Sequence, residues 1–199
     1  MRIILIRHGQ TNWNLERRYQ GSADTCLNTT GHAQASMLAR RFKGERIDRV
    51  YSSDRRRSRE FASMIFTSFA IEPVPDLREV SFGIFEGLTY DEILARHSEI
   101  YKKWIKDPFG VTIPGGESPD RFVSRVMAAF DKIVSSCDEK ERLAIVTHGG
   151  PISVIANGIS GAKSFWEKIP DTASVSVIEI RKEKRLMKAF NDTSHLKNG

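Results

Sequence analysis

Two histidines stand at the ends of two strongly apolar segments. Ile3–Ile6 is followed by Arg7-His8-Gly9, and Leu143–Val146 is followed by Thr147-His148-Gly149. Apolar runs of this kind predict buried strands, and ligands bind beyond the carboxyl ends of parallel strands. Each imidazole therefore falls where a site is expected, and the glycine after it lets backbone N–H groups approach a ligand closely. The matched pattern favours a shared catalytic role over two unrelated turn histidines.

Arginines accompany the first histidine and open a later helix. Arg7 precedes His8; a cation there repels a divalent metal ion but can bind a phosphate through two hydrogen bonds. Arg55–Arg59 opens a predicted helix and contains four arginines. Positive side chains oppose the helix dipole at this end, so we expect part of this charge to face an anion. Three of the four guanidiniums are expected to be solvated.

A candidate proton donor, Glu79, lies in the stretch Leu77–Gly87, which mixes aromatic residues and glycines around carboxylates. A carboxyl group near apolar walls can serve as a general acid. Any one glutamate taken alone is better explained as a surface residue, so this assignment depends on the other motifs.

The composition limits the class of protein. The chain has 199 residues, of which 40% are hydrophobic, and this excludes disordered and fibrous classes. The net charge of +6 favours an anionic partner: a phosphate ester, a nucleic acid or an acidic lipid.

The cysteines and the apolar segments limit the compartment. Cys26 and Cys137 form no CxxC pattern, which argues against a disulfide framework or a cysteine zinc site. No segment approaches the ~20 apolar residues of a membrane helix, so we expect a cytoplasmic protein without membrane contact.

Strand and helix patterns alternate around these residues, which predicts an α/β fold. We expect one domain over residues 1–199: a three-layer α/β/α sandwich with a mostly parallel sheet, an antiparallel edge, and a small lobe (77–117) over the active site. Strands are expected at Arg2–Ile6, Arg49–Ser52, Leu143–Val146, Val175–Ile180 and Leu186–Phe190. Helices are expected at Thr30–Phe42, Arg55–Phe69, after the capping box Thr89–Glu92, from Ser118-Pro119 onward, and at Pro151–Asn157.

The motifs together resemble the histidine phosphatase superfamily, the phosphoglycerate mutase-like proteins. The resemblance covers nearly the whole chain. The motifs follow in the family's order: Arg7–Asn14, then Gln20-Gly21 with Leu27-Asn28 and Gly31, Ser52–Arg57, Leu77–Gly87, Pro114–Ser118 and Thr147–Gly149. The departures are Cys26, Arg55, Phe61 and Phe85, where proline, leucine, threonine and tryptophan are common; they affect pocket shape and not the chemistry.

The resemblance implies a role for each residue. His8 is the nucleophile that forms a phosphohistidine, and Glu79 protonates the leaving oxygen and later activates water. Arg7, Arg57 and His148 neutralise the phosphoryl oxygens, so no metal or cofactor is expected. The further substrate contacts that it implies are Gly9, Thr11, Asn14, Gln20, Gly21 and Gly149.

The branch of the family is predicted from the chain between motifs. Only a short stretch separates Gly87 from Pro114, and the tail after Phe190 is short. Both features predict an open site that water can enter, which favours a phosphatase of small phosphorylated metabolites over a mutase. Trp104–Pro108 ahead of Pro114–Ser118 is similar to α-ribazole phosphatases and to broad-specificity phosphatases.

Three alternatives remain at this point. One is a phosphoglycerate mutase, and another is a noncatalytic scaffold, which the full set of candidate catalytic residues disfavours. The third is a nucleic-acid-binding module that uses Arg55–Arg59. That module needs aromatic residues for base stacking, whereas Phe61 and Phe69 are expected on the apolar face of the helix.

Overall fold

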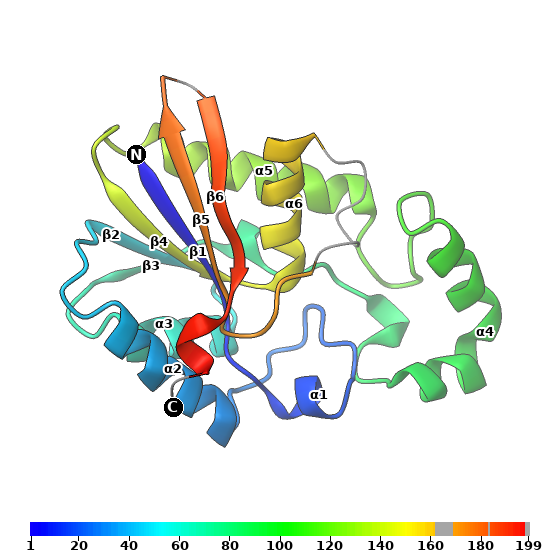
Figure 1. Ribbon diagram of the computed structural model, residues 1–199. Coiled ribbons are helices and arrows are strands. Elements are labelled where there is room, and N and C mark those ends of the chain that lie inside the picture. Colours follow the sequence, from blue (N-terminus) through cyan, green and yellow to red (C-terminus); the bar gives the residue numbers. More distant parts are fainter. Residues whose placement is uncertain (162–168, 183, 198–199) are drawn as a thin grey trace.

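A six-stranded sheet forms the centre of the computed structural model, which describes residues 1–161, 169–182 and 184–197 (Figure 1). The strand order is β3-β2-β4-β1-β5-β6. The first four are parallel to one another, whereas β5 is antiparallel to β1 and to β6. The strands are β1 (Arg2–Arg7), β2 (Arg49–Ser52), β3 (Ile71–Pro73), β4 (Arg142–Thr147), β5 (Val175–Arg181) and β6 (Lys184–Asp192). The mostly parallel sheet with an antiparallel edge is therefore confirmed.

Helices cover both faces of the sheet. They are α1 (Asn12–Leu15), α2 (Thr29–Arg41), α3 (Arg56–Ile65), α4 (Tyr90–Lys106), α5 (Pro119–Ser135) and α6 (Gly149–Ser160). Ile3 and Leu5 of β1 share a core with α5 and α6, whereas Ile4 and Ile6 share a second core with α2 and α3. This alternation is the period-2 pattern of a strand buried on both faces, and it produces the predicted three layers. Among the described residues, no helix is both long and apolar enough to cross a bilayer.

Helix α4 lies to the side of the sandwich, within the expected lobe (Figure 1). It begins at the predicted capping box: the Thr89 hydroxyl accepts the Glu92 N–H, and the Glu92 carboxylate accepts the Thr89 N–H at 2.8 Å. Its inner face joins an aromatic cluster formed by Tyr19, Phe82, Phe85, Tyr101 and Trp104. This cluster is continuous with the core under α5, so the lobe packs on the sandwich.

Several local expectations are wrong. The helix expected over Arg55–Phe69 ends at Ile65, and Phe69 is 37% exposed while Phe66 is buried in its place. The chain turns there to enter β3, whose three residues give too short a pattern to recognise. Helix α1 is likewise unexpected, and α6 begins two residues earlier than expected. The turn expected at Lys182–Lys184 includes residue 183, which lies outside the described residues.

Candidate active site

The two histidines meet at the carboxyl ends of β1 and β4. Arg7 pairs with Thr147 in the parallel register, so a histidine follows on each strand. The His8 N–H donates to the Thr147 carbonyl at 2.9 Å. The ring centroids of His8 and His148 lie 5.1 Å apart, and both side chains are buried. The structure thus brings together the two imidazoles, as the matched strand ends predict.

The hydrogen bonds of His8 leave its Nε2 without a proton. Its Nδ1 lies 2.8 Å from the Gly9 carbonyl oxygen, and because a carbonyl only accepts, Nδ1 carries the proton. Nε2 keeps its lone pair and accepts a long hydrogen bond, 3.3 Å, from Arg57 Nε. Burial lowers the pKa of His8 well below 6.5, and the positive charges of Arg57 and Arg7 lower it further. A neutral imidazole whose Nε2 carries no proton is a nucleophile at neutral pH.

His148 is fully buried beside it. Its Nε2 lies 2.9 Å from the Ser53 hydroxyl, while its Nδ1 is buried with no hydrogen-bond partner among the described residues. Burial lowers the pKa of His148 well below 6.5, with further lowering from Arg57 and His8. If the Ser53 hydroxyl donates to Nε2, then Nδ1 bears a hydrogen that can be donated to an anion.

Arg57 connects the nucleophile to the loop that follows β1. Its side chain is fully buried, and its two terminal nitrogens donate to the carbonyls of Gly21 at 2.9 Å and Ala23 at 2.6 Å. Burial lowers its pKa to about 10, so the guanidinium stays charged at neutral pH. Of the four arginines in this segment, Arg57 alone is buried, as expected; Arg56 and Arg59 are exposed and Arg55 is half-buried.

Arg7 supplies a second cation, which is half-buried. Its Nη1 donates to the Pro170 carbonyl at 2.5 Å, and its Nε is buried without a partner in the described part of the chain. Burial lowers its pKa, and the negative charges of Glu79 and Asp171 oppose that shift. A buried donor that no protein group satisfies is available to a ligand oxygen.

Glu79 lies against the first turn of α6. One carboxylate oxygen accepts the Gly150 N–H at 3.0 Å, and the other accepts the Val80 N–H at 3.0 Å. A Cβ at position 150 would lie 2.1 Å from Glu79 Oε1, so a larger residue there would require the carboxylate to move. The helix N-terminus and its dipole therefore fix the position of this carboxylate.

A pocket of about 280 Å³ joins these groups. Its lining includes the expected residues Arg7, His8, Asn14, Gln20, Gly21, Arg57 and Glu79. Gly9, Thr11, Gly149 and His148 are not part of the lining. Thr11 is fully buried and caps α1: its hydroxyl accepts the Asn14 N–H at 3.2 Å, and the Asn14 Oδ1 accepts the Thr11 N–H at 3.0 Å. Substrate contacts stay predictions for the six residues named for that role.

The pocket lining also contains residues that the motifs do not single out, among them Trp13, Arg17, Arg18, Tyr19 and Phe82. The two neighbouring arginines differ. Arg18 is committed to the carboxylates of Glu16 and Glu92, at 2.7 and 2.6 Å. The guanidinium of Arg17 is exposed, and it has no hydrogen bond or ion pair within the described ranges. Two adjacent arginines look alike in a sequence, so only the fold shows which one is free.

Residues 3–193 match the model of the histidine phosphatase superfamily (branch 1). The chain belongs to this superfamily. It is 38% identical over 199 residues to the metal-independent phosphoserine phosphatase of Arabidopsis thaliana, covering 98% of this chain and 82% of that protein. It is 37% identical to phosphoglycerate mutase-like protein 4 of the same plant, covering 98% and 86%.

Among solved structures, a putative α-ribazole-5′-P phosphatase from Escherichia coli superposes with a TM-score of 0.90 at 26% identity, covering 96% of each chain. The predictions of the α/β fold and of a phosphatase of this superfamily are confirmed.

Proposed function

We propose that this histidine phosphatase hydrolyses a small phosphomonoester through a phosphohistidine on Nε2 of His8. The observation that carries the proposal is the geometry at His8: Nδ1 holds its proton against the Gly9 carbonyl, and the ring lines a pocket that Arg7, Arg57 and Glu79 also line. Phosphoryl transfer requires mainly positioning and neutralisation of charge, and the buried guanidinium of Arg57 and the half-buried Arg7 supply both. The proposal needs no metal ion.

The reaction divides into two displacements. In the first, the Nε2 lone pair of His8 attacks phosphorus, the bond to the leaving oxygen breaks, and that oxygen takes a proton from the Glu79 carboxyl group. In the second, the Glu79 carboxylate takes a proton from water, the oxygen attacks phosphorus, and the P–N bond breaks to restore neutral His8. Nδ1 of His148 donates to a phosphoryl oxygen. Forming a covalent intermediate splits one difficult step into two easier ones.

The pocket lining favours a leaving group with a carboxylate, of the phosphoserine kind. Arg17 lines the pocket and has no side-chain partner among the described residues, and a guanidinium matches a carboxylate with two parallel hydrogen bonds. The Arabidopsis relative is named a phosphoserine phosphatase, which supports this assignment. α-Ribazole phosphate is the second candidate, and the superposition on the Escherichia coli protein favours it.

A hydrolysis panel tests the proposal. Phosphoserine, 3-phosphoglycerate, α-ribazole 5′-phosphate and p-nitrophenyl phosphate are each assayed for phosphate release, with a chelator present throughout. We expect phosphoserine to show the highest kcat/KM. Isomerisation of 3-phosphoglycerate primed by 2,3-bisphosphoglycerate, in place of hydrolysis, would show a mutase. Activity that depends on added metal would contradict the metal-free mechanism.

Arg17→Ala tests the carboxylate assignment. Loss of a charge-assisted contact should raise KM for phosphoserine about 10- to 100-fold and leave p-nitrophenyl phosphate, which has no carboxylate, nearly unchanged. Arg59→Ala, which removes an exposed arginine of α3, is the matched control. An equal effect on both substrates would exclude Arg17 from carboxylate recognition.

The alternative of a nucleic-acid-binding module at Arg55–Arg59 is weakened, because two side chains on which it depends are buried. Phe61, one of its two nearby aromatic residues, is fully buried in the core, and Arg57 is buried at the pocket. Neither side chain is accessible to a nucleic acid from the surface.

A further inference from the structure

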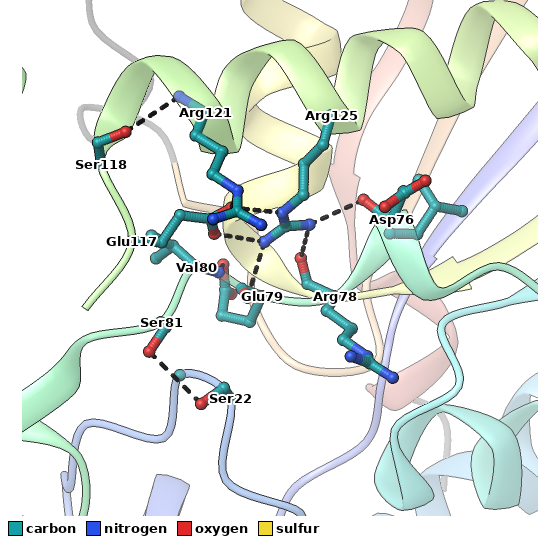
Figure 2. Close-up of polar contacts among 12 residues, drawn as sticks. Ser22, Asp76, Arg78, Glu79, Val80, Ser81, Glu117, Ser118, Arg121 and Arg125 are labelled. Atoms are coloured by element: carbon teal, nitrogen blue, oxygen red, sulfur yellow. Dashed lines mark hydrogen bonds and ion pairs between the residues drawn. The ribbon is translucent and has the colours of Figure 1, made fainter. Parts of the chain in front are cut away.

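Arg125 of α5 binds the backbone of the segment that carries Glu79 (Figure 2). Its Nη1 donates to the carbonyls of Asp76 and Arg78, both at 2.8 Å. Its Nη2 donates to the carbonyl of Glu79 itself at 3.1 Å. One side chain thus fixes three carbonyls within four consecutive residues.

Glu117 completes the arrangement. Its two carboxylate oxygens accept from Nε and Nη2 of Arg125, each at 2.7 Å. With these bonds, all five N–H groups of the guanidinium have an acceptor. The Glu117 N–H also donates to the Ser81 carbonyl at 3.0 Å, so the pair is attached to the segment on both sides of Glu79. Both side chains are largely buried, 18% and 11% exposed, which strengthens the pair relative to one on the surface.

The segment needs this support because it has no regular structure of its own. Residues 78–82 form neither helix nor strand, between the 3₁₀ turns Pro75–Leu77 and Gly83–Phe85. No hydrogen bonds of a regular strand or helix therefore fix the backbone position of Glu79 in the pocket wall. Its carboxylate is located by two backbone N–H groups at one end and its carbonyl by Arg125 at the other.

We propose that Arg125, paired with Glu117, is a positioning residue for proton transfer by Glu79. This inference rests on the proposed function, since it takes Glu79 as the donor to the leaving oxygen. A displacement of about 1 Å can cost a catalytic group ~10²-fold in rate. Loss of the pair therefore slows the protonation-dependent step selectively and leaves attack by His8 intact.

The leaving group separates these two effects. An alkyl phosphate such as phosphoserine needs a proton on its leaving oxygen, whereas p-nitrophenolate leaves readily without one. Because kcat/KM reports only the steps up to cleavage of the P–O bond, it excludes later hydrolysis of the phosphoenzyme. For Arg125→Met we expect kcat/KM to fall about 10- to 100-fold with phosphoserine and less than about 3-fold with p-nitrophenyl phosphate. The inhibition constant of inorganic phosphate should stay within about 2-fold and reports an intact phosphate site.

Arg121→Met is the matched control. Arg121 is also on α5 and lies 4.0 Å from the same Glu117, but its side chain is 81% exposed (Figure 2). We expect this variant to match the wild type on both substrates. Glu117→Gln keeps the shape of the partner and should give the same selective loss, but smaller; it decides the matter if Arg125→Met does not fold.

The outcomes are distinct. Equal losses on both substrates, or no loss on phosphoserine, would overturn the positioning role while leaving the proposed function in place. A wild-type protein that hydrolyses neither phosphate would overturn the proposed function, and the inference with it.

Discussion

The nucleophile and the proton donor are fixed in place by different means. His8 and His148 continue two adjacent parallel strands, so a ladder of backbone hydrogen bonds sets their separation. Glu79 lies in an irregular segment that depends on hydrogen bonds from Arg125. One substitution outside the site cannot remove a ladder, but it can remove a guanidinium. We therefore expect the chemistry at His8 to tolerate distant changes and the chemistry at Glu79 to be sensitive to them.

The largest effect is expected from His8→Ala, which removes the nucleophile. Hydrolysis should fall roughly 10⁴-fold or more for every substrate, irrespective of the leaving group. Acid quenching of wild type during turnover should trap an acid-labile phosphoenzyme that the variant lacks. A variant with a near-normal rate would falsify the nucleophile assignment.

Glu79→Gln tests the proton donor, as His8→Ala tests the nucleophile. We expect kcat/KM for phosphoserine to fall ~10²- to 10⁴-fold, with a much smaller loss for p-nitrophenyl phosphate, because only the first needs the proton. Affinity for inorganic phosphate should persist. A large loss of that affinity instead would make Glu79 a structural residue.

Combining Glu79→Gln with Arg125→Met tests whether Arg125 acts through Glu79. If Arg125 acts through Glu79, the double variant is no slower than Glu79→Gln alone. Additive losses would show that the two residues act independently.

The smallest effect concerns stability against pH. The folded state keeps His8 and His148 neutral, with pKa values below 6.5, whereas the unfolded chain binds protons near that value. Stability is therefore full above about pH 6.5 and falls as the pH drops below it, by about 1.4 kcal/mol per pH unit for each histidine. Urea unfolding at about pH 7.5 and pH 5.5 measures the slope, and His148→Gln should reduce it. An unchanged slope in that variant would contradict the buried, neutral state of His148.

The elements that carry the nucleophile could be predicted, because they carry strong local signals. β1 and β4 are continuous apolar runs, and Thr89 and Ser118 are N-caps as expected. The prediction was weaker where local signals compete or are short. β3 has three residues and ends in proline, and the sequence shows no separate signal for the capping of α1 by Thr11, whose substrate contact stays a prediction.

The roles of Arg17 and Arg125 could not be predicted in this way. An arginine side chain is long and can reach several partners, so its role depends on which carbonyls and carboxylates the fold brings near it. Nothing near Arg125 in the sequence shows that its partners lie at residues 76–79. The resemblance to the superfamily located the chemistry, but not the side chains that support it.

Gly150 has a consequence for how this enzyme can be altered. Even a methyl group there would displace the Glu79 carboxyl from its present position, so we expect substitutions at this position to disturb the acid. Trp13 and Arg17 also line the pocket, but no hydrogen bond or ion pair joins either side chain to Glu79 in the described part of the chain. New substrate preferences should therefore arise more readily by changing Trp13 and Arg17 than by changing the first turn of α6.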